Sequence, residues 1–121
     1  MIRILLADDD PGVRKGLRMR LELEPDIEIV GEAGNGLVAI EQARALGADV
    51  VLMDIRMPVV DGIAATQAIC ADSPHAAVVV VSLCDDPETK ALATGAGACD
   101  FVCKHEATER LIGAIHQAAG R

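Results

Sequence analysis

The 121-residue sequence is almost without aromatic side chains, since it has no tryptophan, no tyrosine and a single phenylalanine, Phe101. Base stacking and flavin binding depend on aromatic platforms, so the sequence disfavours single-stranded nucleic acid and flavin as ligands. Basic charge is also scarce: 19 acidic residues outnumber 11 basic ones and give a net charge of −8. A surface of that sign repels phosphate backbones, and we therefore expect no direct binding of DNA or RNA by this domain.

Long apolar runs are absent as well. The opening segment Ile2–Ala7 is followed by three aspartates and is too short for a signal peptide or a membrane span. We accordingly expect a cytoplasmic protein without membrane contact. The four cysteines contain no Cys-x-x-Cys pair, which disfavours a disulfide or zinc site and favours a role as small buried apolar residues. They are Cys70, Cys84, Cys99 and Cys103.

With 51% apolar residues, the chain has the size and hydrophobicity of one compact domain, residues 1–121. Short apolar runs alternate with segments of helical spacing, the pattern of a parallel sheet covered on both faces. The predicted strands are Ile2–Ala7, Ile27–Glu32, Asp49–Asp54, Ala76–Ser82 and Cys99–Lys104. Right-handed crossovers then predict an α/β, flavodoxin-like, doubly wound sheet of five parallel strands in the order 2-1-3-4-5, with five helices.

Local signals set the limits of two of the helices. Asp10 can cap the first helix, and Pro25 is expected to end it. The segment from Pro87 to Thr94 has only one large apolar residue, Leu92. A helix there would be weakly held, and we expect it to be the movable element of the fold.

Polar residues cluster where the predicted strands end. Asp8 and Asp9 follow the first strand, and Asp54, Ser82 and Lys104 end the third, fourth and fifth strands. Ligands of such sheets bind at this edge. Carboxylates about 4 Å apart repel by on the order of 4 kcal/mol at an effective dielectric constant near 20, so a cation must accompany them. Oxygen ligands without histidine favour Mg²⁺.

A carboxylate beside Mg²⁺, a lysine and a hydroxyl can act as a nucleophile toward phosphorus and form an aspartyl phosphate. Asp54 is the best candidate for that nucleophile, because it ends a central strand. Asp8 and Asp9 are then expected to hold the metal. Lys104 and Ser82 are expected to contact the phosphoryl oxygens as charge develops on them.

Together these motifs resemble the receiver domain of bacterial two-component response regulators, from Ile2 to about Ala119. The resemblance rests on the acidic motif Leu5–Pro11, on Val51–Pro58 with Asp61-Gly62, and on Ser82 and Lys104. Two further segments are similar to the LuxR/NarL-type subfamily. They are Ile29-Val30-Gly31-Glu32-Ala33 followed by Asn35-Gly36, and Gly95-Ala96-Gly97.

The resemblance implies a CheY-like fold in which Asp54 is the phosphoacceptor. It further implies that Asp9 and Asp54 bind the metal directly and that Asp8 does so through water. The backbone carbonyl of Arg56 would complete the protein ligands.

Two further positions belong to the expected switch. Phe101 falls where the family places an aromatic side chain that turns inward when the hydroxyl residue, here Ser82, moves toward the phosphate; plain core packing is the alternative for Phe101. Leu83 stands where the family commonly carries a small residue, and we expect it to narrow access to Asp54.

The resemblance also implies partners. A histidine kinase would donate the phosphoryl group, and the switch would control an output domain or a partner such as a second receiver in a homodimer, with transcription as the expected output.

Regulators of the LuxR/NarL type usually append a helix-turn-helix domain. None is encoded here, so we expect either the receiver part of a longer regulator, which reaches DNA only through that missing domain, or a stand-alone receiver. Beyond self-catalysed phosphotransfer and autodephosphorylation, no enzyme activity is expected.

Two alternatives remain open. A pseudo-receiver would keep the fold but bind its partner without phosphate. A phosphatase of the haloacid-dehalogenase type would use Asp8-x-Asp10 after an apolar strand and also proceed through an aspartyl phosphate. The short chain and the missing downstream acidic motif disfavour the phosphatase.

Overall fold

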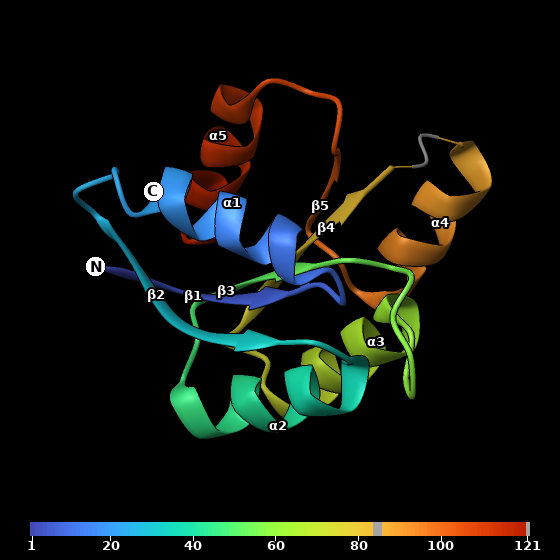
Figure 1. The fold of residues 1–121 in the computed structure, drawn as a ribbon. Coiled ribbons are helices and arrows are strands. Elements are labelled where there is room, and N and C mark those ends of the chain that lie inside the picture. Colours follow the sequence, from blue (N-terminus) through green and yellow to red (C-terminus); the bar gives the residue numbers. More distant parts are fainter. Residues whose placement is uncertain (84–85, 121) are drawn as a thin grey trace.

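The computed structural model describes residues 1–83 and 86–120. It contains one parallel sheet with the strand order β2-β1-β3-β4-β5, and helices pack on both of its faces (Figure 1). The strands are β1 (Ile2–Ala7), β2 (Ile27–Ala33), β3 (Val50–Met53), β4 (Ala77–Ser82) and β5 (Asp100–Cys103). The helices are α1 (Pro11–Leu21), α2 (Gly36–Leu46), α3 (Gly62–Asp72), α4 (Pro87–Ala96) and α5 (Thr108–Ala118). The predicted fold class and strand order are confirmed.

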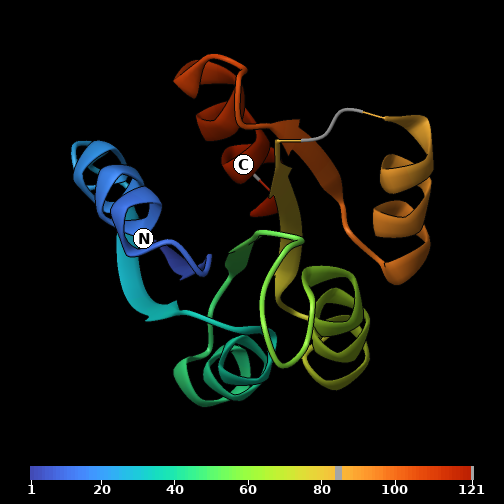
Figure 2. The ribbon, with the colours of Figure 1, turned by 45° about the vertical axis from the view of Figure 1, so that its right-hand side comes forward.

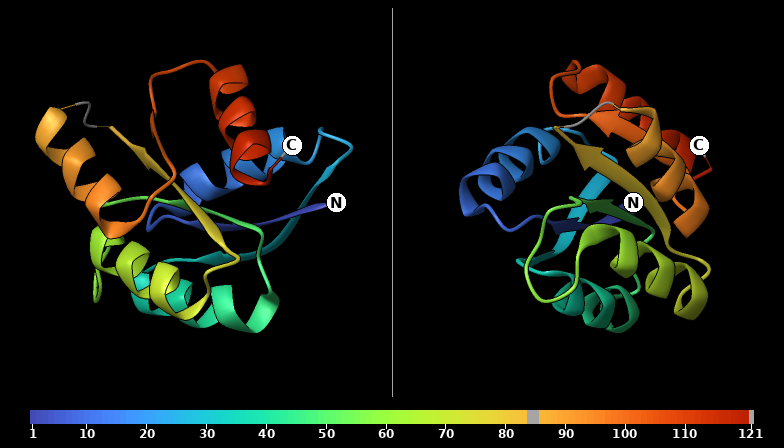
Figure 3. Two further views of the ribbon diagram at one scale, coloured as in Figure 1. Left: turned by 180° about the vertical axis from the view of Figure 1, so that it is seen from behind. Right: turned by 90° about the vertical axis from the view of Figure 1, so that its right-hand side faces the viewer.

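The sheet separates two apolar cores (Figures 1 and 3). Helices α1 and α5 cover one face, and α2, α3 and α4 cover the other. The first core is built around residues such as Leu21, Leu111 and Ile115. The second is built around residues such as Ala43, Ile69 and Ala93. Side chains of a strand alternate between the two faces of the sheet. Strand β3, which is apolar throughout, and β4, which is apolar except for Ser82, therefore contribute to both cores and lie inside the sheet, as predicted.

Several boundaries differ from the sequence prediction: β2 extends to Ala33, β3 is Val50–Met53, β4 begins at Ala77, and β5 ends at Cys103. Helix α1 ends at Leu21, well before Pro25, because the N–H groups of Leu23 and Glu24 turn back to carbonyls of the last helical turn. Strand β5 begins at Asp100, after Cys99.

Helix α4 has few buried anchors: Ala93 is its only buried residue, and Leu92 is exposed. Helix α1 likewise has a single buried residue, Leu21, so the expectation that α4 is the movable element stays a prediction. Figure 2 shows α4 at the β5 side of the molecule, beside α3. A helix attached by so little buried surface can be displaced at low cost in free energy.

The cysteines do not share one environment. Cys103 is buried, as predicted, but Cys70 is half-buried and Cys99 is exposed. The prediction was wrong for Cys99 because it precedes β5, which is an edge strand and is only partly covered. Cys84 lies outside the described residues. Within residues 1–83 and 86–120, no helix is both long enough and apolar enough to cross a membrane.

Gly62 allows the start of α3 to lie directly against the loop after β3. A Cβ atom at this position would stand 1.9 Å from the carbonyl oxygen of Asp54. We expect Gly62→Ala to lower the free energy of unfolding by about 1–3 kcal/mol, because the backbone must move to relieve the overlap. Gly113, in α5, faces open space, and Gly113→Ala should raise stability by about 0.5–1 kcal/mol. Urea unfolding checks both, and a Gly62→Ala protein as stable as wild type would contradict the close approach.

Candidate functional site

The carboxyl ends of four strands bring the predicted polar residues together. Lys104 Nζ, after β5, lies 2.9 Å from Asp8 Oδ2, after β1, and 3.4 Å from Asp54 Oδ1, after β3. Ser82 ends β4 and lines the same pocket, which has a volume of about 290 Å³. Asp8, Asp54 and Ser82 are only 4%, 9% and 5% exposed, so the reactive groups lie at the bottom of the pocket.

Backbone hydrogen bonds that continue past the strand ends hold these residues in register. The N–H of Asp54 donates to the carbonyl of Ala7 at 2.9 Å, and the N–H of Lys104 donates to the carbonyl of Ser82 at 2.7 Å. The N–H of Asp8 donates to Ala33 at 3.0 Å. The sheet itself therefore fixes the backbone of Asp8, Asp54 and Lys104, although these residues lie just beyond the strand ends.

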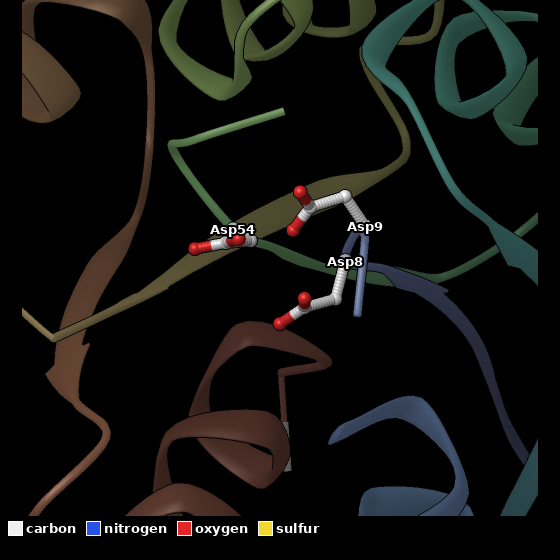
Figure 4. Close-up of side chains that lie close together, drawn as sticks. All are labelled: Asp8, Asp9 and Asp54. Atoms are coloured by element: carbon white, nitrogen blue, oxygen red, sulfur yellow. The ribbon is translucent and has the colours of Figure 1, made fainter. Parts of the chain in front are cut away.

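Three aspartates form a group that could hold a metal ion. One carboxylate oxygen each from Asp8, Asp9 and Asp54 lies within 4.8 Å of the others, and Figure 4 shows the three carboxylates turned to the same side. Ligands on opposite sides of an octahedral Mg²⁺ are about 4.2 Å apart, so small side-chain adjustments would let these oxygens share one ion. A set made only of carboxylate oxygens fits a hard divalent cation.

The charges of this pocket shift two pKa values. Burial, with help from the charge of Asp8, raises the pKa of Asp54 above its ordinary value, and the charge and hydrogen bond of Lys104 counter this only in part. Burial alone would lower the pKa of Lys104, but its hydrogen bond to Asp8 and the charges of both aspartates outweigh burial and raise it. Lys104 therefore stays protonated at neutral pH, as an electrostatic partner of the carboxylates.

Other predicted residues occupy distinct positions. Arg56 and Leu83 line the pocket, and Leu83 is 62% exposed at its mouth. Asp10 also lines the pocket, but its carboxylate accepts hydrogen bonds from the N–H groups of Gly12 and Val13 and caps α1, as predicted. Phe101 does not line the pocket.

The Phe101 ring instead packs, half-buried, against the core under α2, α3 and α4. Lys90 Nζ, from α4, lies 5.8 Å from the ring centroid. This is the core-packing environment that the sequence left open for Phe101, at the border between the sheet and α4.

The sequence analysis named Lys104 as the basic residue of the site and missed Arg14. Arg14 Nη1 donates to the backbone carbonyl of Asp8 at 2.5 Å, and its Nε donates to Glu32 at 3.1 Å. Two signals were available: Arg14 lies one helical turn after Asp10, and Glu32 stands near the carboxyl end of a strand.

Fold and site together define a doubly wound α/β domain with an acidic pocket at the carboxyl edge of its sheet, and comparison with known proteins identifies the family. Residues 4–116 match the response regulator receiver domain, and the chain belongs to that family. Solved structures agree: the response regulator domain of Thermotoga maritima CheB has 32% identity and a TM-score of 0.92 and covers 100% of this chain and 98% of that one. The signal receiver domain of NarL from Mycobacterium tuberculosis has 31% identity and a TM-score of 0.93 and covers 98% and 96%.

Curated relatives include transcriptional regulators. LiaR of Bacillus subtilis is 38% identical over 119 residues, which are 98% of this chain and 56% of LiaR. NarL of Escherichia coli K12 is 37% identical over 116 residues, 96% of this chain and 54% of NarL. These relatives support the NarL-type subfamily. A methylesterase/glutaminase of Methanosarcina acetivorans is 42% identical over 106 residues, 87% of this chain but 30% of the enzyme. The chain thus spans about half or less of these relatives, and the match is to the receiver family.

The shifted pKa of Asp54 predicts a characteristic pH dependence. A carboxyl group whose pKa is raised by folding stabilises the protein while protonated and loses that contribution as pH rises through the folded-state pKa. In metal-free buffer, Asp54→Asn should therefore raise the free energy of unfolding at pH 7, with the gain vanishing below the ordinary pKa of 3.8.

Asp100 provides a control of opposite sign. Its hydrogen bond from Arg110 lowers the pKa of Asp100, so its carboxylate stabilises the fold above the ordinary pKa and this contribution is lost as pH falls. Asp100→Asn should destabilise the protein at pH 7. Urea unfolding from pH 3 to 8 tests both, and the same sign for the two variants at pH 7 would contradict the electrostatics described for the pocket.

Proposed function

We propose that the chain is a phosphorylation-dependent switch in which Asp54 accepts a phosphoryl group from a histidine kinase. One observation carries this proposal: a buried carboxylate stands in contact with an ammonium group and beside two further carboxylates. Such an arrangement serves no apparent purpose in stability, because burial disfavours the charge of Asp54.

The transfer balances as a displacement at phosphorus. An Asp54 oxygen forms a bond to phosphorus while the bond between phosphorus and the nitrogen of the kinase phosphohistidine breaks. The electron pair of that bond returns to the imidazole. Lys104 Nζ, already 3.4 Å from Asp54 Oδ1, is placed to neutralise phosphoryl oxygens, and the Ser82 hydroxyl contacts another of them.

The metal that fits the pocket is Mg²⁺. Asp9 and Asp54 would bind it directly, Asp8 through water, and the backbone carbonyl of Arg56 would complete the protein ligands. When bound, the ion offsets the negative charge shared by the carboxylates and the incoming phosphoryl group. The backbone hydrogen bonds at the strand ends hold the acidic residues close enough for this role, with one oxygen of each within 4.8 Å of the others.

The added phosphoryl charge is expected to draw Ser82 and Lys104 toward Asp54. Phe101 is the switch aromatic in this proposal. Its ring supports α4 through the core and through Lys90. Movement of that ring would shift a helix with a single buried anchor, and the exposed surface of α4 would change for a partner.

We further propose that residues 1–121 are one cytoplasmic receiver domain that controls transcription through an output domain or a second receiver. Its relatives LiaR and NarL are transcriptional regulators by name. RcsB of Salmonella enterica, 26% identical with a TM-score of 0.88, has been solved bound to a promoter with a phosphate mimic. DNA contact would belong to a further domain, and the receiver would act by self-catalysed transfer and hydrolysis only.

The two alternatives make different demands on the site. A pseudo-receiver has no need of an acidic cluster held around Lys104, yet that cluster is present. A haloacid-dehalogenase-type phosphatase would need the carboxylate of Asp10 for acid–base chemistry, but that carboxylate caps α1. Both observations favour the phosphoacceptor.

Phosphorylation provides the direct test. With Mg²⁺ and a small acyl phosphate, wild type should gain one base-labile phosphoryl group, seen as a mass increase that hydroxylamine or alkali removes. Asp54→Asn should gain none, because the nucleophile is gone, and a chelator should suppress labelling of wild type. Asp61→Asn, which alters a helix cap next to the same loop, should still be labelled.

Labelling of neither wild type nor Asp54→Asn would indicate the pseudo-receiver. Steady turnover of a generic phosphate monoester by wild type would indicate the phosphatase.

Leu83 offers a test of access. Because its exposed side chain lines the pocket mouth, Leu83→Ala should increase both the rate of labelling and the rate of hydrolysis of the phosphoryl group. Leu92→Ala, which removes an equally exposed leucine from α4, should leave the small-donor labelling rate unchanged. Mass spectrometry over time gives both rates. Equal rates for Leu83→Ala and wild type would show that Leu83 does not limit access.

A further inference from the structure

Arg14 links the acidic loop to the neighbouring strand. Its Nη1 donates to the backbone carbonyl of Asp8 at 2.5 Å, and its Nε donates to Glu32 Oε1 at 3.1 Å. The side chain is 19% exposed, so this guanidinium group is mostly enclosed between α1 and β2. A planar group with donors in fixed directions can hold two acceptors at once, which a single ammonium cannot do with the same precision.

Every polar group of Asp8 takes part in a hydrogen bond. Its N–H donates to Ala33 at 3.0 Å, and its carbonyl accepts from Arg14. Its Oδ1 accepts from the Asp10 N–H at 2.9 Å, and its Oδ2 accepts from Lys104 at 2.9 Å. The carbonyl held by Arg14 belongs to the peptide that joins Asp8 to Asp9. Fixing this peptide plane also fixes the direction in which Asp9 leaves the chain.

Glu32 is itself held in place. Arg18 Nε donates to Glu32 Oε2 at 2.7 Å, so the two carboxylate oxygens are engaged by two guanidinium groups of α1. The hydrogen bond from Arg18 is the main cause that lowers the pKa of Glu32, and Glu32 therefore stays ionised at neutral pH. Glu32 orients the Arg14 fork toward the Asp8 carbonyl.

We propose that Arg14, oriented by Glu32, is a positioning residue that preorganises the Asp8–Asp9 peptide for binding of a divalent cation. The proposal rests on the magnesium site of the proposed function and adds a residue that binds neither metal nor phosphate. Groups that orient metal ligands in this way commonly change metal affinity by about 10- to 100-fold when they are removed.

A purely electrostatic role of Arg14 predicts the opposite sign. The guanidinium group repels a cation, so its removal would tighten Mg²⁺ binding if charge were its only effect. Positioning predicts weaker binding after removal, although the local negative charge increases. The sign of the change therefore separates the two roles.

The experiment measures Mg²⁺ binding to the unphosphorylated protein by amide NMR titration or calorimetry, because the chain has no tryptophan or tyrosine to report binding. Arg14→Met should raise the dissociation constant about 10-fold. Arg14→Lys keeps the charge but not the fork, and should give a smaller increase. Arg44→Met is the matched control: it breaks an exposed ion pair with Asp72 between α2 and α3, and should leave Mg²⁺ affinity unchanged.

Glu32→Gln tests the orienting role. It should also weaken Mg²⁺ binding, and the double variant Arg14→Met with Glu32→Gln should bind no more weakly than Arg14→Met alone, because both changes interrupt one chain of contacts. Additive effects would overturn the assignment of Glu32. Unchanged or tighter binding by Arg14→Met would overturn the assignment of Arg14.

Amide spectra recorded without metal show whether each variant is folded. If Arg14→Met does not fold, the Mg²⁺ affinity of Arg14→Lys is compared with that of wild type instead. Wild type that binds no Mg²⁺, or whose Asp54 is not labelled, would overturn the proposed function. Wild type that binds and is labelled, with Arg14 variants of equal affinity, would overturn only this inference.

Discussion

The contact of one ammonium group with two buried carboxylates is the interaction on which the site depends. Lys104 reaches Asp8 and Asp54 from the far end of the chain, and without it these two buried carboxylates would face one another with no cation between them. At about 4 Å, each like-charge pair costs on the order of 4 kcal/mol at an effective dielectric constant near 20, a large part of the stability of a small domain. One ammonium offsets part of this repulsion, and the remainder makes the pocket attract further positive charge.

The strands beside that pocket are more deeply buried than helix α4. Strands β1, β3 and β4 are buried from both sides and hold Asp8, Asp54 and Ser82 at one edge of the sheet. By contrast, α4 buries only Ala93, and its Lys90 contacts the Phe101 ring. A rigid site next to a loosely attached helix is an arrangement in which a local change of charge can alter a distant surface without unfolding the core.

Much of this arrangement follows from the sequence. Uniformly apolar runs such as Val78–Val81 identify central strands, and the rule that parallel strands end at one edge brings Asp8, Asp54 and Lys104 together. Hydrogen-bond partners of long side chains do not follow in the same way. Arg14 has several rotatable bonds and could have faced solvent, and only the packed structure shows it between α1 and β2.

Exposure at the ends of elements was equally hard to predict. Cysteine is usually a buried residue, but Cys99 lies just before an edge strand and is exposed. The end of α1 at Leu21 depends on two turn hydrogen bonds, which compete with the continuation of the helix toward Pro25. Such outcomes are settled by differences of about 1 kcal/mol, which residue patterns do not resolve.

The close approach at Gly62 has a mechanical consequence. Since the backbone of α3 lies against the carbonyl of Asp54 with no side chain between them, the start of α3 and the loop that follows β3 are held close together. Under the proposed function, the start of α3 would therefore stay beside the phosphorylated residue, and a side chain at position 62 would push that helix away from it.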